Sequence, residues 1–325
     1  MHVNNTIIIY RELFLSPYLK REKFICMKNL FSCALAALLF VFFIASCAKK
    51  DEITLSQQDN SLSELKITTD SYISSLASSP KIDNNTPQVQ GFWDRIRNVL
   101  TVIGDLAGGA AGWGIGGPIG AIIGGGAASA LMYYEINDGN PIVPKDETVA
   151  YAAANPNNPF DYVGYYHYYT MNQIAKPPND YINTDGTFST QKFHSFSGNL
   201  LQQQGVITYT QFNNLSLSSV ENNLLYIKSN LNYSNSSVDV NGFLNTIHTD
   251  GRINSGSKDA LVSYFNALQS FSRLQSATVQ DINNFISYST TMENTVASSA
   301  LNSDDKAMVL STMATARYGV HYWLK

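Results

Sequence analysis

Cysteine and charge are both scarce in this chain of 325 residues. The sequence has three cysteines, and only 14% of its residues are Asp, Glu, Lys or Arg. Cys26, Cys33 and Cys47 all lie within the first 47 residues. The rest of the chain therefore has no thiol for a disulfide framework, a cysteine-bound zinc ion or a cysteine nucleophile. Its stability must come from packing.

The balance of charge argues against one class of partner. Lys and Arg number 21, and Asp and Glu number 25. Residues 1–47 hold five of the basic and two of the acidic residues, which leaves residues 48–325 with a net charge of −7. Nucleic-acid binding depends on clustered Lys and Arg, and no such cluster occurs here. We therefore expect no nucleic acid among the partners.

Recognisable catalytic patterns are also missing. No Walker loop, Gly-x-Ser-x-Gly elbow or dinucleotide fingerprint occurs. Two Thr-Asp-Gly turns, at Asp185 and Asp250, have the middle of a calcium loop but lack its outer carboxylates. No His-Glu-x-x-His motif joins the widely spread histidines of residues 48–325, which are His167, His194, His248 and His321. We predict no catalytic, cofactor-binding or metal-binding residues, and a protein that is not an enzyme.

The chain begins with the pattern of a secretory signal. From Met27 a short charged start leads into an apolar run over residues 30–44, followed by Ala-Ser-Cys. Residues 44–47 resemble the lipobox of bacterial lipoproteins, which implies cleavage before Cys47 and lipidation of that cysteine. A transmembrane anchor is the alternative, but the run is shorter than a span of about 20 residues. We expect Met27 to be the true start; a long n-region is the alternative for residues 1–26.

The residues after Cys47 indicate the localisation of the protein. Residues 48–52, Ala-Lys-Lys-Asp-Glu, resemble the surface-export signal of Bacteroidota lipoproteins. This implies a lipid anchor in the outer membrane and exposure at the cell surface, with release from the cell left open. Residues 47–90 are rich in Ser, Asp, Asn and Gln, which predicts a flexible, disordered tether. A short helix over residues 61–75 is the alternative there.

Small residues recur at every fourth position in the next segment. Residues 91–104 have the spacing of a short amphipathic helix, and no charged residue occurs between Asp105 and Glu135. Residues four apart share one helix face, so the small residues form a groove that another helix can enter. The members of this glycine zipper are Gly104, Gly108, Gly112, Gly116, Gly120, Gly124 and Ala128.

Pro118 divides the zipper segment. Its ring cannot donate a backbone hydrogen bond and clashes with the carbonyl of Gly114, which predicts a kink or a helical hairpin. A hairpin over residues 91–136 would lay Gly104, Gly108 and Gly112 against the glycines of the second arm. Such a hairpin can insert into a membrane or self-associate through its glycine face. Burial within a water-soluble fold is the alternative.

The remaining sequence predicts an all-α fold. Residues 137–158 have the Gly, Asn and Pro signals of a hinge. Helical spacing then predicts helices after Asn158-Pro159, near 189–204, after a capping box of Ser218 and Glu221, over 257–274, after Thr278, and from Ser303 to the terminus. About 165 residues bury one ordinary core. We expect residues 159–325 to form a C-terminal helical bundle.

The order of these segments resembles a group of exported Bacteroidota lipoproteins. They combine a glycine-zipper segment with a helical domain that opens in an Asn-Pro-aromatic-Asp-aromatic-Val-Gly motif, followed closely by His and then Asn. Residues 158–167 match this motif, and Tyr168 departs from it. The resemblance implies architecture rather than activity. The spacing of the glycines is also similar to that in bacteriocins and colicin-like, contact-dependent toxins.

Surface export, a tether and a zipper together suggest a membrane-active antibacterial toxin. The membrane is then the expected partner, through the lipid on Cys47 and through the zipper, and the sequence identifies no receptor. The rival hypothesis is a structural or binding lipoprotein whose hairpin docks in its own bundle.

Overall fold

The computed structural model describes residues 50–78, 90–145, 152–178, 181–234, 237–274 and 278–324. The chain divides into two compact units, Met1–Ser56 and Gln57–Lys325. All the side-chain contacts below belong to the second unit. Cys47 and the signal segment lie outside the described residues, so the predicted lipidation stays a prediction.

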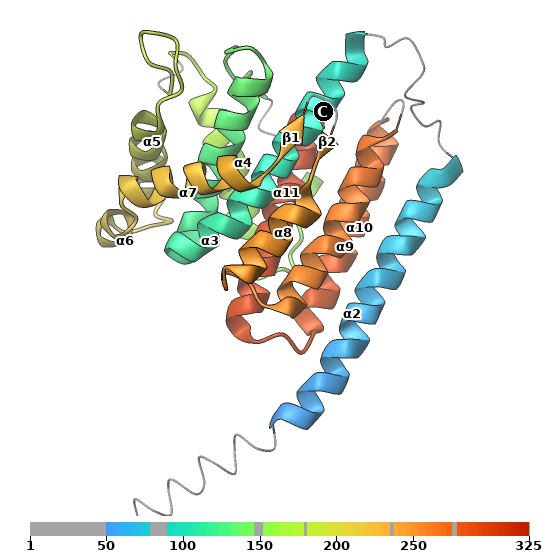
Figure 1. The fold of residues 1–325 in the computed structure, drawn as a ribbon. Coiled ribbons are helices and arrows are strands. Elements are labelled where there is room, and N and C mark those ends of the chain that lie inside the picture. Colours follow the sequence, from blue (N-terminus) through green and yellow to red (C-terminus); the bar gives the residue numbers. More distant parts are fainter. Residues whose placement is uncertain are drawn as a thin grey trace, which may run out of the picture. The chain divides into compact units, whose positions relative to one another are not determined.

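The prediction of an all-α fold is confirmed. One antiparallel pair of two-residue strands, β1 (Tyr233–Ser234) and β2 (Ser237–Val238), interrupts an otherwise helical order. The helices of Figure 1 are α2 (Lys50–Ser75), α3 (Gln90–Ile136), α4 (Asp161–Ile174), α5 (Thr190–Gln203), α6 (Tyr209–Asn214), α7 (Leu217–Asn230), α8 (Val240–Thr249), α9 (Ser255–Ser272), α10 (Val279–Ser298) and α11 (Ser303–Leu324).

Side-chain caps fix where several helices begin. Thr278 and Asp281 form the predicted capping box of α10, and Ser189 caps α5. The predicted box at Ser218 is wrong, because α7 begins two residues earlier with Ser216 as its N-cap. Helices α6 and α8 were not predicted. Helix α6 has only six residues, too few to show a helical period, whereas the spacing of Val240, Phe243, Leu244 and Ile247 in α8 is a helical signal that could have identified it.

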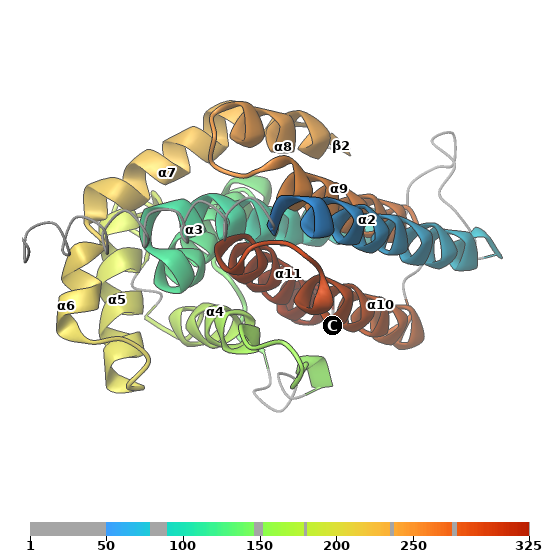
Figure 2. The same cartoon turned by 90° about the horizontal axis from the view of Figure 1, so that it is seen from below.

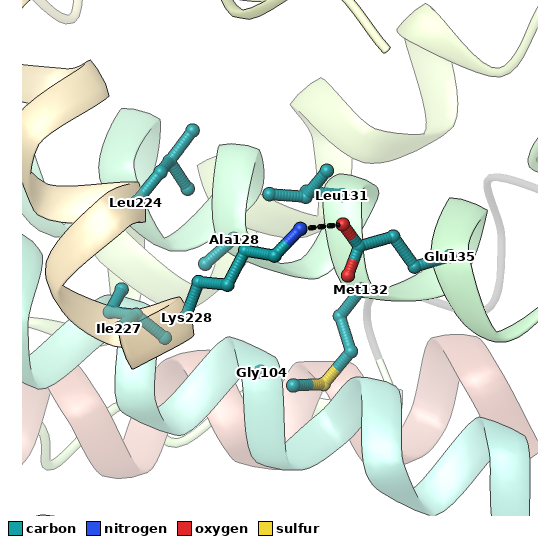
Figure 3. Close-up of a pocket in the computed structure, with 8 residues that line it drawn as sticks. All are labelled: Gly104, Ala128, Leu131, Met132, Glu135, Leu224, Ile227 and Lys228. Atoms are coloured by element: carbon teal, nitrogen blue, oxygen red, sulfur yellow. Dashed lines mark hydrogen bonds and ion pairs between the residues drawn. The ribbon is translucent and has the colours of Figure 1, made fainter. Parts of the chain in front are cut away.

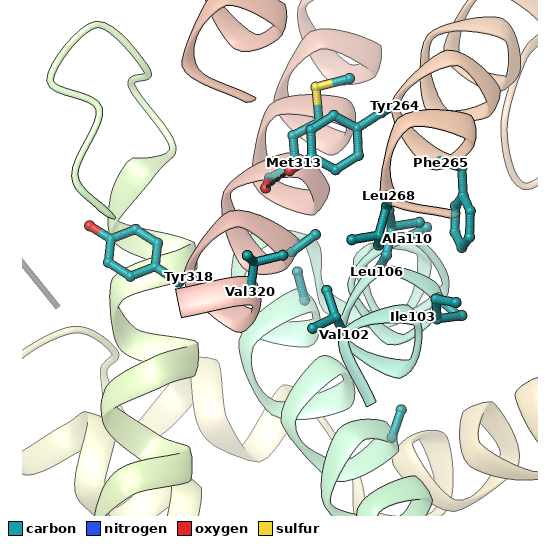
Figure 4. Packing of buried hydrophobic residues seen from close by; sticks show 14 of the residues in the cluster. Val102, Ile103, Leu106, Ala110, Tyr264, Phe265, Leu268, Met313, Tyr318 and Val320 are labelled. Atoms are coloured by element: carbon teal, nitrogen blue, oxygen red, sulfur yellow. Dashed lines mark hydrogen bonds between the residues drawn. The ribbon is translucent and has the colours of Figure 1, made fainter. Parts of the chain in front are cut away.

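Helix α11 forms the centre of the second unit. Every residue from Ala307 to Trp323 is buried, and α3, α4, α9 and α10 all contact this helix (Figure 2). Figure 4 shows apolar side chains of α3, α9 and α11 meeting in the core. A helix that is buried on all sides shows little amphipathic pattern, so its central place could not be inferred from its sequence.

Helix α2 occupies part of the stretch in which we expected a flexible tether. Its C-terminal half places Leu65, Thr69 and Tyr72 in buried positions. The Thr69 hydroxyl lies 2.8 Å from that of Tyr288 on α10, and the Tyr72 ring stacks on Tyr288 at a centroid distance of 4.5 Å. The buried positions follow three- and four-residue spacings and so lie on one face of the helix. Packing of that face on α10 holds this otherwise polar segment in place.

The glycine segment and the C-terminal helices belong to the same compact unit. The intervening residues contain the turns expected of a hinge, but they are not all exposed. Asn155 and Asn158 are buried, and both amides donate to Glu293 of α10. Hydrogen bonding of these side chains to the core ties down a segment that its composition marks only as a turn.

Buried tyrosines predict that the fold is lost in alkali. Burial raises the pKa of Tyr181 to about 12, and burial raises the pKa of Tyr264 and Tyr288 as well. Unfolded tyrosines ionise near pH 10, so the unfolded chain loses protons first as the pH rises. The stabilising effect of burying neutral tyrosine is complete below about pH 10 and is lost as the pH rises through about 12.

We expect tyrosinate absorbance and loss of helical circular dichroism to rise together over that interval. Ionisation of every tyrosine near pH 10 with the helices intact would contradict this account.

Candidate functional site

The glycine segment forms the predicted helical hairpin. Helix α3 is interrupted at Gly116 and Gly117, whose backbone angles are not helical, directly before Pro118. Gly117 has a φ of +57°, a conformation that side-chain-bearing residues rarely adopt. The missing amide hydrogen of Pro118 and the permissive backbone of Gly117 thus place the turn where the sequence predicted it.

The two arms of the hairpin pack against each other at the predicted zipper residues. A Cβ atom on Gly108 would lie 2.7 Å from the Cα of Gly125 and 2.8 Å from the Cβ of Ala128. A Cβ on Gly112 would collide with the carbonyl oxygen of Gly120, and the reverse is also true. The arms are therefore in backbone contact, which the glycines alone permit.

The other zipper glycines extend this contact between the arms. Gly104 faces Ser129 and Met132, and Gly124 faces the Cα of Gly112. Gly116 is the exception among the predicted zipper residues, because it lies at the exposed turn and faces the side chain of Leu215. Packing of the zipper on itself is thus an intramolecular contact in this structure.

Other close approaches attach the hairpin and α4 to α11, and the sequence did not predict them. A Cβ on Gly109 would lie 3.7 Å from the Cβ of Thr315, and one on Gly319 would collide with the carboxylate of Asp105. A Cβ on Gly164 would lie 2.5 Å from the carbonyl oxygen of Ala314. The glycine of the Asn-Pro-Phe-Asp-Tyr-Val-Gly motif therefore allows α4 to lie directly on α11.

Asp105 is a fully buried carboxylate near the open end of the hairpin. It accepts hydrogen bonds from Ser129 of the opposite arm and from the indole of Trp323, at 3.0 Å. His167 Nε2 of α4 lies 2.9 Å from the same carboxylate. These contacts join both arms to α4 and α11 and satisfy the buried charge.

The Asp105 cluster contains Ser, His and Asp, but it does not have the geometry of a catalytic triad. Ser129 contacts the carboxylate rather than the imidazole, so His167 does not hydrogen-bond the hydroxyl that it would have to activate. All three residues are buried. Among the described residues, no group of three His, Cys, Asp or Glu side chains could hold a metal ion.

A second buried network surrounds Arg317 of α11. Its Nε atom donates to Glu293 at 2.7 Å, and its Nη2 atom donates to Glu293 and Asp161. Burial alone would lower the pKa of Arg317, but the two carboxylates raise it above its usual range, so the side chain stays charged. Asp161 also accepts a hydrogen bond from Tyr318, at 2.9 Å.

Together the two networks account for the motif that begins α4. Asn158 reaches Glu293, Asp161 reaches Arg317, Gly164 contacts α11 and His167 reaches Asp105. The sequence alone indicates only a family resemblance for these residues and no role. In the structure they fasten α4 to α10, α11 and the hairpin.

Helix α7 covers the second arm of the hairpin less well. A small groove that is open to solvent lies between them, and Figure 3 shows the ion pair between Lys228 and Glu135 beside it, at 2.6 Å. Asn223 is buried against Gly124, but its side-chain amide has no hydrogen-bond partner among the described residues. An unsatisfied buried amide costs about 1–3 kcal/mol, so this contact is weak.

Part of the hairpin has the composition of a membrane span. Among the described residues, one segment, Asn98–Ile136, is long and apolar enough to cross a membrane. Its most apolar stretch of 18 residues has a mean hydropathy of 1.5, and 67% of that stretch is buried within the protein. Length and composition are weak evidence alone, since the core helix of a water-soluble protein has the same properties.

Comparison with known proteins gives no further guide to function. No family model, no curated protein and no solved structure matches this chain.

The backbone contact between the arms predicts that one added methyl group is costly. Gly112→Ala places its Cβ against the carbonyl of Gly120 and forces the arms apart, so we expect a loss of about 1–3 kcal/mol in the free energy of unfolding. Gly114→Ala is the matched control, because nothing lies within 4 Å of its Cβ. Alanine there should leave stability unchanged or raise it by about 1 kcal/mol. Equal urea midpoints for the two variants would contradict the seam.

The Arg317 network predicts a larger loss in the free energy of unfolding. Arg317→Leu leaves Glu293 charged and buried without its counterion, which should cost about 3–5 kcal/mol of unfolding free energy. Lys228→Ala removes an ion pair whose lysine is 55% exposed, and it should cost less than about 1 kcal/mol. Chemical denaturation followed by circular dichroism measures both. A small effect of Arg317→Leu would show that the network is dispensable.

Proposed function

We propose that this protein is a surface-exposed bacterial lipoprotein that acts as a membrane-active antibacterial toxin. In this proposal the helical unit stores the glycine hairpin in its core, and the hairpin inserts into a target membrane after release. The observation that carries the proposal is a membrane-length apolar hairpin whose arms bind each other through their own backbones. Lipidation at Cys47 and export to the cell surface remain part of the proposal.

The dimensions of the hairpin support this role. Each half of the segment Asn98–Ile136 is about 28 Å long as a helix, close to the hydrocarbon thickness of about 30 Å. The seam between the arms uses contacts within α3 only, so it persists when the hairpin leaves the core. Asp105 is the charged side chain of the first arm. Its charge must be compensated if the whole arm is to span the bilayer, because an unpaired charge is costly there.

The contacts around the hairpin are also consistent with release. Asp105 attaches the first arm to α4 and α11 through hydrogen bonds with His167 and Trp323. On the opposite side, α7 covers the second arm with an unsatisfied Asn223 and an exposed ion pair. Because exposed ion pairs contribute little, α7 is the helix expected to separate first from the hairpin.

The alternative is a non-catalytic structural or binding lipoprotein of the outer membrane. It is favoured by the burial of the hairpin and by its close contacts with α11, which suit a permanent core. In that case the glycines serve tight packing and the hairpin never leaves the fold. The two functions differ in whether the hairpin moves.

Engineered disulfides distinguish the two functions. Residues 48–325 contain no cysteine, so new pairs are unambiguous. Gly109→Cys with Thr315→Cys joins the hairpin to α11 across a Cβ separation of 3.7 Å, and Gly104→Cys with Met132→Cys joins the two arms across 3.5 Å. Both separations suit a disulfide, for which Cβ atoms lie about 3.5–4.5 Å apart.

Dye release from liposomes is then measured for residues 48–325, intact and after limited proteolysis. The proposal predicts leakage after cleavage, no leakage while the 109–315 disulfide is oxidised, and leakage again on reduction. The 104–132 disulfide leaves the hairpin free to move as a unit, so leakage should continue. Leakage that ignores the 109–315 disulfide contradicts insertion of the hairpin, and no leakage in any state favours the structural or binding lipoprotein.

A further inference from the structure

The outward side of α4 is occupied by tyrosine. Its unburied positions include Tyr162, Tyr165, Tyr166 and Tyr169, which have the spacing of one helix face, while the core face holds Val163, Gly164, His167 and Tyr168. Helix α4 contains no Lys, Arg or Glu, and its one acidic side chain, Asp161, is bound to Arg317. An ordinary surface helix carries charge on this side.

The tyrosine face adjoins the turn of the glycine hairpin. The Trp113 ring lies 6.0 Å from that of Phe160, which lies 6.4 Å from that of Tyr162. Residues 113–119, at the turn of the hairpin, are not buried, and Gly114 is open to solvent. An uncharged, aromatic surface therefore begins at the apolar turn and continues along α4, at the periphery of the unit in Figure 2.

We propose that this surface, formed by Trp113, Phe160 and the tyrosines of α4, docks the folded protein on the interface of a lipid bilayer. This proposal rests on the proposed function, because it supplies the step before the hairpin inserts. Tyr and Trp prefer the headgroup region, where the ring is sheltered and its polar atom stays hydrated. Docking through this surface brings the hairpin turn to the membrane first.

The charge of the protein indicates which lipids it contacts. Residues 48–325 carry a net charge of −7, and α4 offers no cation for an anionic headgroup. Attraction to anionic lipid requires Lys or Arg near the surface and is screened by salt. Binding through aromatic rings should therefore occur on zwitterionic phosphatidylcholine and should be insensitive to salt.

Vesicle flotation with residues 48–325 tests this surface. The double variant Tyr162→Ser and Tyr166→Ser should bind phosphatidylcholine vesicles about tenfold more weakly than the unmodified chain. The matched control is Tyr209→Ser with Leu225→Ser, which removes two side chains that are 71% and 64% exposed on α6 and α7. The control should bind normally, and tryptophan at positions 162 and 166 should restore binding.

Dye release on the same samples separates the two proposals. Normal flotation of the serine double variant overturns the docking surface, whether or not the protein leaks dye. Tyrosine-dependent flotation without leakage in any state supports the surface and contradicts the toxin. Equal losses in the double variant and its control, or binding that falls with salt, also overturn the surface. If the unmodified chain does not float with vesicles, the proposal is wrong.

Discussion

Close approach of helix backbones at glycine is the constraint on which the rest of this structure depends. The arms of α3 touch at Gly108, Gly112 and Gly120, and α4 reaches α11 at Gly164. Each contact fails if a Cβ atom is added, because the opposing atoms belong to backbone that cannot move aside. Tight packing of this kind gains dispersion energy over a long seam and offsets the poor helix propensity of glycine.

Buried charge is arranged around these seams. Asp105 and Arg317 lie on helices that have no solvent face at those positions, and each is satisfied by partners from other helices. Paired buried charges add little net stability, but an unpaired one is very costly. The networks therefore reject other arrangements of α4, α10 and α11 and help to select a single packing. Residues at the beginning of α4 contribute hydrogen bonds to both networks.

The hairpin and several helices could be predicted from local patterns. Pro118 and the four-residue spacing of glycine act within a few residues, and the Thr278 cap acts within one turn, so the sequence shows them directly. Helix α6 and the order of α2 could not be predicted in the same way. Helix α6 is too short to show a helical period, and α2 is polar except for a narrow row of residues that are buried only by contact with α10.

The sequence by itself determined the helical class, the turn at Pro118 and which glycine faces meet, because these follow from backbone chemistry between near neighbours. Only the tertiary structure decided that the hairpin lies inside the fold, that α11 is its central support and that Asp105 meets His167 across 62 positions. A glycine seam suits a membrane and a protein core equally, since both exclude water. The partners that surround it come from distant parts of the chain, and no local pattern in the sequence records them.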